Sequence, residues 1–154
     1  MSEADFHAAV DRMPEHFSEL MSGEPLPMRA PKEWAGLHAI YVFYDANGEP
    51  CHVGRTRNLQ GRIRAHTANS HHSASFAFKR ARKELGVEAT YRKGEGRADL
   101  LARPDFRAAF DRHRGEIREM SVRYVEIDCP IEQHLFELYA AMRLGTSLSE
   151  FTTS

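Results

Sequence analysis

The sequence predicts an α+β fold: a small antiparallel sheet of about three strands with helices packed on its faces. Two strand-like runs rich in apolar and aromatic residues, 38–45 and 50–56, are separated by a turn signal, and a third run covers residues 121–128. Apolar residues before, between and after these runs recur at helical spacing. With 154 residues, of which 42% are hydrophobic, the chain can bury one core.

Residues 2–22 are predicted to be helical, because Ser2 can cap a helix and apolar residues follow at spacings of three and four. These apolar residues are Phe6, Val10, Met13, Phe17 and Met21. Their stripe is too apolar to stay in water, so we expect it to pack on the core or on a second subunit. Pro14 interrupts the pattern, which leaves two short helices or one kinked helix. Residues 23–36 hold three prolines and are expected to form an extended loop.

An Asn-Gly pair between the first two strand-like runs predicts a tight hairpin turn, since Asn-Gly tolerates positive φ. A helix is then expected from about residue 57 to residue 67. A polar loop leads to a second helix, which is capped at Ser73 or Ser75 and ends at Gly86. The inner stripe of this second helix is formed by Ala74, Phe78, Ala81 and Leu85.

The pattern of residues 87–103 is ambiguous. We interpret it as a short strand from Val87 to Tyr91 followed by a glycine-rich loop. Pro104 starts the next helix, because proline is favoured in the first helical turn. The side of this helix that we expect to be buried carries Phe106, Phe110, His113 and Ile117.

The third strand-like run has two candidate apolar faces, formed by Val122 and Tyr124 or by Val125 and Ile127. Pro130 opens a last helix that ends at Gly145. Its apolar residues are Leu135, Leu138, Ala141, Met142 and Leu144. We therefore expect an N-terminal helix with a proline-rich linker over residues 1–35. The main domain would cover residues 36–154, with an insertion at about 87–120.

The formal net charge of −1 is unevenly distributed along the chain. Residues 52–93 contain ten basic and only two acidic residues, a net charge of +8, whereas the segments before and after carry −6 and −3. Such a concentration is typical of a phosphate-binding surface, although a helix with solvated basic side chains gives the same pattern. The residues that we predict to bind the nucleic-acid backbone are Arg55, Arg57, Arg64, Lys79, Arg80 and Lys83.

The segment 52–66 reads HVGRTRNLQGRIRAH and combines glycine, arginine and histidine in an order that suits phosphodiester cleavage. One face of the expected helix carries Asn58, Arg62 and His66 at successive i, i+4 steps. The opposite side offers leucine and isoleucine to a core.

These motifs resemble those of the GIY-YIG nuclease family. Residues 39–41, Ala-Ile-Tyr, stand where the family has Gly-Ile-Tyr, and residues 52–54, His-Val-Gly, where it has Tyr-Ile-Gly. An Asn-Leu pair and Arg62 complete the pattern. The resemblance covers roughly residues 36–86 and 121–151, and it implies the family's compact α+β core and metal-dependent cleavage of phosphodiester bonds.

The resemblance also implies roles for single residues. Tyr41, with His52, would position and deprotonate water. Arg62 would stabilise the pentacoordinate phosphate, and His66 would contact a non-bridging or leaving oxygen. Taken singly, each of these residues also fits a purely structural role; it is their combination at this spacing that indicates a nuclease.

The family takes a metal-binding glutamate from a later helix with apolar neighbours, and Glu137 matches that context. By this resemblance Glu137 would hold Mg²⁺ or Mn²⁺. Glu132 is the rival, but a carboxylate in the first turn of a helix complements the helix dipole and needs no function. Two neighbouring pairs, Cys51 with His52 and His71 with His72, raise the alternative of a zinc site. Cys51 and His52 cannot easily share one metal, because adjacent strand residues point to opposite faces. His71 and His72 lie in a polar loop, where solvated side chains or contact with phosphate are expected.

Two positions depart from the family pattern in ways that bear on chemistry. His52 replaces a tyrosine; an imidazole with a pKa near ~6.5 is a better base at neutral pH than a phenol near ~10. The change therefore fits an adapted site and equally a degenerate one. Ser149 stands where the family has asparagine, which weakens one supporting hydrogen bond.

The sequence thus predicts a metal-dependent GIY-YIG-type DNA endonuclease. The alternative is a catalytically impaired module of the same fold that binds nucleic acid or a protein partner. No apolar run is long enough to span a bilayer and the N-terminus is acidic, so we expect a cytoplasmic protein. No separate DNA-reading module is visible; specificity would come from a homodimer, a partner protein or residues 87–120.

Overall fold

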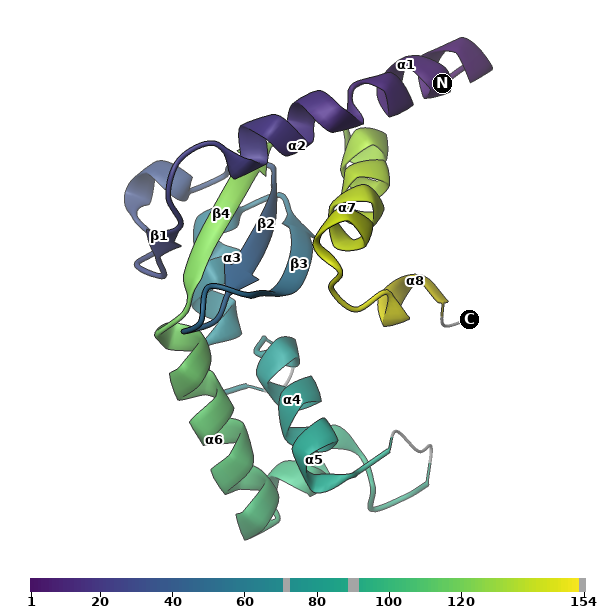
Figure 1. The fold of residues 1–154 in the computed structure, drawn as a ribbon. Coiled ribbons are helices and arrows are strands. Elements are labelled where there is room, and N and C mark those ends of the chain that lie inside the picture. Colours follow the sequence, from purple (N-terminus) through teal and green to yellow (C-terminus); the bar gives the residue numbers. More distant parts are fainter. Residues whose placement is uncertain (71–72, 89–91, 153–154) are drawn as a thin grey trace. The chain divides into compact units, whose positions relative to one another are not determined.

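The computed structural model describes residues 1–70, 73–88 and 92–152 of the chain (Figure 1). It divides into two compact units, the first made of Met1–Gln60 with Met120–Ser154 and the second of Gly61–Glu119. The first unit contains the sheet, and the second consists of helices and their connections. The predicted α+β class is confirmed. Within the described residues, no helix has the length and apolar character needed to cross a membrane.

The sheet of the first unit has four antiparallel strands in the order β1-β4-β2-β3. They are β1 (Leu26–Pro27), β2 (Ala39–Tyr44), β3 (Pro50–Thr56) and β4 (Ser121–Glu126). The sequence predicted three of these strands. It missed β1, which lies in the expected proline-rich loop, because a two-residue strand exists only through its pairing with distant residues of β4.

Strand β2 is the centre of the sheet, and all six of its residues are buried. Ile40, Val42 and Tyr44 face a core formed with α2 (Met13–Met21) and α7 (Pro130–Leu144). The intervening residues point to the other face, because side chains alternate along a strand. Both candidate faces of β4 are covered, since Val122, Val125 and Ile127 are all buried. A single alternating pattern could not show this.

The N-terminal segment forms two helices, α1 (Glu3–Asp11) and α2, rather than one kinked helix. Ser2 caps α1 as expected: its Oγ accepts from the Asp5 amide, and the Asp5 carboxylate accepts from the Ser2 amide. Pro14 lies in the first turn of α2, where proline is tolerated. The α2 half of the predicted stripe packs on the sheet, whereas Phe6 and Val10 of α1 remain exposed and α1 extends away from the sheet (Figure 1).

The hairpin between β2 and β3 turns at Gly48, which has the positive φ of 78° that we expected of the Asn-Gly pair. The Asp45 carboxylate accepts hydrogen bonds from the amides of Asn47 and Glu49 and holds the turn closed. The register shifts at the end of β2, between Phe43 and Tyr44.

Helix α7 buries only part of its apolar residues: Ala141 is in the core, and Leu135 and Leu144 are partly buried against it. Leu138 and Met142 are exposed, and the buried residues are Glu132, Gln133, Phe136, Glu137, Ala140 and Ala141. The helix carries apolar residues on more than one side, so periodicity alone did not identify the side that meets the sheet. After Gly145, which ends α7 with a φ of 70°, α8 (Ser149–Thr152) follows.

Helix α3 (Leu59–His66) begins at the end of the first unit and continues into the second. The other helices of the second unit are α4 (Ser75–Leu85), α5 (Arg97–Leu101) and α6 (Pro104–Arg118), and η1 (Lys32–Trp34) is a short 3₁₀ turn of the first unit. Phe78 of α4 packs on Phe106 and Phe110 of α6, with ring centroids 5.0 and 6.3 Å apart.

Three predictions for the second unit need correction. Helix α4 starts after Ala74 without a side-chain cap, and Leu85 is exposed. Helix α5 was expected to be a glycine-rich loop. The strand expected from Val87 lies partly in residues 89–91, outside the described residues, as do His71 and His72; Val87 and Glu88 themselves form no strand.

Candidate functional site

Tyr41 and Gly54 form a pair across strands β2 and β3. A Cβ added to Gly54 would lie 2.3 Å from both Cζ and Oη of Tyr41, so the phenol ring crosses the β3 backbone where no side chain stands. Gly54 has no positive φ, and the register shift lies elsewhere in the hairpin. This glycine is therefore required for close approach of the Tyr41 ring to the β3 backbone.

His52 lies on the same face of the sheet as Tyr41. The ring centroids of these two residues are 5.8 Å apart, and His52 is 5.4 Å from Phe43, its partner in the strand register. Tyr41 itself is buried, and His52 is half-buried. The structure thus brings together the two residues that we predicted to act on water.

Glu137 is a buried carboxylate on α7, with 7% of the residue exposed. Its Oε2 lies 3.2 Å from Nε of Arg55, a residue of β3. Burial raises the pKa of Glu137 to about 7; Arg55 opposes this rise and the charge of Glu150 adds to it. Within the described part of the chain, this Oε2 atom is buried and accepts no hydrogen bond of good geometry.

Arg55 follows Gly54 and therefore points to the face of the sheet opposite to Tyr41 and His52. The structure accordingly shows two pairs, Tyr41 with His52 and Arg55 with Glu137, on the two sides of β3. In the described sheet β3 is an edge strand next to α7 (Figure 1). The sequence analysis missed the contact between Arg55 and Glu137, because no local pattern links residues so far apart in the chain.

Glu132, the rival of Glu137, has structural partners. Its carboxylate binds the guanidinium of Arg12 and lies 3.8 Å from His16. These contacts join α7 to the N-terminal helices. The preference for Glu137 over Glu132 as the functional carboxylate stays a prediction.

Arg62 and His66 both lie on α3, in the part that belongs to the second unit. Arg62 is half-buried, and His66 is completely buried, with the Phe76 ring at a centroid distance of 6.4 Å. Asn58, which precedes α3, accepts a hydrogen bond from the Gly36 amide through Oδ1. Asn58 therefore anchors a loop of the first unit, and the phosphate contacts of Arg62 and His66 stay predictions.

Residues 37–97 match the family model described as the GIY-YIG catalytic domain. The resemblance to the GIY-YIG family is confirmed. The match includes the close pair Tyr41 and Gly54, His52, and both predicted residues of α3, whereas Glu137 lies beyond it. Comparison with curated proteins gave no match, and comparison with solved structures gave none either. A GIY-YIG domain indicates nuclease activity in general.

The basic residues predicted to bind nucleic acid fall into two groups. Arg57, Arg64, Lys79 and Lys83 are exposed. Arg80 is held within the second unit: Nη2 lies 3.0 Å from the Glu116 carboxylate, and Nε donates to His113 Nδ1. Arg55 is engaged with Glu137, as described above.

The Glu137 carboxylate has the donor chemistry that a magnesium ion requires. Mg²⁺ keeps several water ligands and is commonly held by one or two carboxylates together with substrate phosphates. Glu137 offers one such carboxylate, and its Oε2 accepts no hydrogen bond of good geometry from the described residues. The described residues contain no group of three or more His, Cys, Asp or Glu side chains that could hold a metal by themselves.

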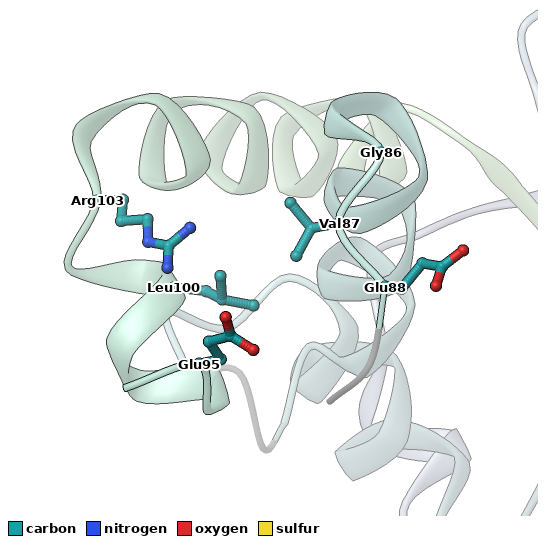
Figure 2. Close-up of a pocket in the computed structure, with 6 residues that line it drawn as sticks. All are labelled: Gly86, Val87, Glu88, Glu95, Leu100 and Arg103. Atoms are coloured by element: carbon teal, nitrogen blue, oxygen red, sulfur yellow. The ribbon is translucent and has the colours of Figure 1, made fainter. Parts of the chain in front are cut away.

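The second unit has a pocket of about 330 Å³ that none of the predicted GIY-YIG residues lines. Its lining residues are Gly86, Val87, Glu88, Glu95, Leu100 and Arg103. Figure 2 shows Val87 and Leu100 directed into the space, with Arg103 and Glu95 beside Leu100 and Glu88 pointing outward.

Replacing Gly54 by alanine should destabilise the protein by about 1–3 kcal/mol, because the new Cβ would force the Tyr41 ring out of position. Urea denaturation measures this change. Gly115→Ala is the matched control: Gly115 lies in α6 with nothing within 4 Å of an added Cβ, so alanine should be neutral or stabilising there. Equal effects of the two substitutions would show that Tyr41 does not depend on Gly54.

Stability should fall with pH because of Glu137. In the folded state the pKa of Glu137 is about 7, whereas in the unfolded chain it is near the ordinary value of 4.5. Between pH 4.5 and pH 7 the folded state therefore binds one more proton than the unfolded chain. The free energy of unfolding should therefore decrease by up to about 3 kcal/mol across this window. Glu137→Gln should remove that decrease, and Glu126→Gln, at an exposed carboxyl, should leave it. Identical pH profiles for wild type and Glu137→Gln would contradict the prediction.

Proposed function

We propose that this chain is a metal-dependent endonuclease that hydrolyses DNA phosphodiester bonds by a GIY-YIG-type mechanism. The observation that carries the proposal is Tyr41 lying across Gly54 beside His52, inside the segment that matches the GIY-YIG catalytic domain. A tyrosine whose ring fills the place of a missing side chain is held in one orientation. Such rigid placement is what a group that positions a water molecule needs.

In the proposed reaction, His52 is the base that removes a proton from the attacking water. A neutral imidazole is available for this at physiological pH, whereas a phenol is largely protonated there. Tyr41 would hold the water by a hydrogen bond, and the contact between the two rings keeps them at a fixed separation. The histidine in place of the family's tyrosine thus fits an adapted site.

Charge stabilisation falls to the remaining predicted residues. Arg62 would neutralise the pentacoordinate phosphate, and His66 would donate to a non-bridging or leaving oxygen. Glu137 would hold Mg²⁺ or Mn²⁺. The bound ion would supply charge neutralisation at the phosphate and lower the pKa of a water molecule.

The exposed basic residues Arg57, Arg64, Lys79 and Lys83 would bind the DNA backbone, which positions a duplex without reading its sequence. Specificity would then come from a homodimer or from a partner protein.

The second candidate function is a catalytically impaired GIY-YIG-fold module that binds nucleic acid or a protein partner. The complete burial of His66 favours it, because an imidazole with no exposed surface must be uncovered before it touches a phosphate. This candidate predicts binding without metal-dependent cleavage.

Nicking of supercoiled plasmid in Mg²⁺ or Mn²⁺ tests the enzyme directly. We expect His52→Ala and Glu137→Ala to lower the cleavage rate by a factor on the order of 10²–10⁴, the usual contribution of a proton-transferring or metal-holding group. His134→Ala, at an exposed histidine of α7, is the control and should cut like wild type. His52→Tyr restores the family's residue and should retain cleavage. If wild type and His52→Tyr both bind DNA and neither cuts it, the binding module is the correct function.

DNA affinity should fall steeply with salt, because bound phosphates release counterions. The double variant Arg57→Ala with Lys83→Ala removes two exposed basic groups and should reduce the slope of log Kd against log salt by up to about 2. Arg118→Ala with Arg29→Ala, at exposed positions outside the basic stretch, is the charge-matched control. An equal slope for both double variants would place the DNA-binding surface elsewhere.

A further inference from the structure

Arg55 and Glu137 form an asymmetric ion pair. The side chain of Glu137 is 9% exposed, whereas that of Arg55 is 46% exposed, and their Nε and Oε2 atoms are 3.2 Å apart. The carboxylate is thus fixed within the first unit, and the guanidinium reaches it from the solvent side. Arg55 makes no other ion pair with the described residues.

The surroundings of this pair carry excess negative charge. The charge of Glu150 acts on Glu137 as well as that of Arg55, and it opposes ionisation of the Glu137 carboxyl. A buried carboxylate without a cation is strongly unfavourable. Arg55 therefore supplies, in the protein alone, the positive charge that a divalent ion would otherwise bring.

The guanidinium and a metal ion would compete for the same carboxylate. Two cations within a few ångströms of each other, where solvent screens them poorly, repel strongly. Since Glu137 is fixed and Arg55 has a long, partly solvated side chain on an edge strand, the arginine is the group that can leave.

Resting on the proposed nuclease function, we propose that Arg55 occupies the metal position at Glu137 in the free protein, and that binding of a divalent ion releases it to contact a DNA phosphate. Arg55 is then a positioning residue whose partner changes from carboxylate to phosphate. Arginine suits both partners, because its planar donors match each of them. Metal binding and DNA binding would strengthen each other, since each favours the same released state of Arg55.

The competition is measured by Mn²⁺ titration followed by electron paramagnetic resonance, on the full chain without DNA. The titration is done at pH 8.5, which is above the Glu137 pKa of about 7, so that the carboxylate is ionised in every protein compared. Differences in Mn²⁺ affinity then report the loss of the arginine charge. Arg55→Ala should bind Mn²⁺ about tenfold more tightly than wild type, because the competing cation is gone. Arg29→Ala, at an exposed arginine of the same unit, removes the same charge and should leave the affinity unchanged.

A second measurement covers the case in which Arg55→Ala does not fold. In ¹⁵N-labelled wild type, the Nε–Hε resonance of Arg55 should move toward the position of a solvated arginine as Mg²⁺ is added, and Glu137→Gln should abolish this change. The competition would be overturned if Arg55→Ala bound Mn²⁺ equally or more weakly than wild type. It would also be overturned if the Arg55 resonance stayed in place while amides around Glu137 responded to Mg²⁺. Either result would leave the nuclease proposal standing. A wild type without any Glu137-dependent ion binding would overturn both.

Discussion

Strand β2 is bonded to β3 on one side and β4 on the other and is buried on both faces, so its register positions every other part of the first unit. One face of β2 provides the apolar residues that receive α2 and α7. The other face provides Tyr41, and the register places Gly54 opposite it. If the pairing register of β2 shifted by one residue, Tyr41 would point toward the helices. A residue with a side chain, rather than Gly54, would then lie opposite it. The fold and the candidate site therefore depend on the same pairing.

The second constraint is the cost of burying the Glu137 carboxylate. Phe136 and the small residues Ala140 and Ala141 pack α7 on the sheet, and this packing takes Glu137 out of water. Burial outweighs the attraction of Arg55, which is why the pKa of Glu137 rises to about 7 although a cation is 3.2 Å away. A helix stabilised by apolar contacts thus holds a carboxylate that favours any further cation. Under the proposed nuclease function, that further cation would be the divalent metal ion.

Much of the local structure could be predicted because its cause is local. Ser2 caps α1, Pro14 separates two helices, Gly86 and Gly145 end α4 and α7, and the Asn-Gly pair turns the hairpin. Each result follows from the backbone preferences of one or two residues. The predictions that were wrong needed knowledge of a distant partner. Strand β1 exists through β4, and the buried side of α7 was selected by the sheet rather than by its own periodicity.

For the candidate site, the sequence by itself determined which chemical groups are present. A tyrosine, a histidine and an arginine-rich helix lie within residues 37–97, which match the GIY-YIG catalytic domain, and a glutamate follows beyond that match. Residue types and local spacing are properties of the chain before it folds. The tertiary structure alone decided that Gly54 makes room for the Tyr41 ring, that His66 is buried, and that the partly exposed Arg55 pairs with Glu137. Steric exclusion, desolvation and ion pairing act between atoms brought together by folding, and no separation along the chain encodes them directly.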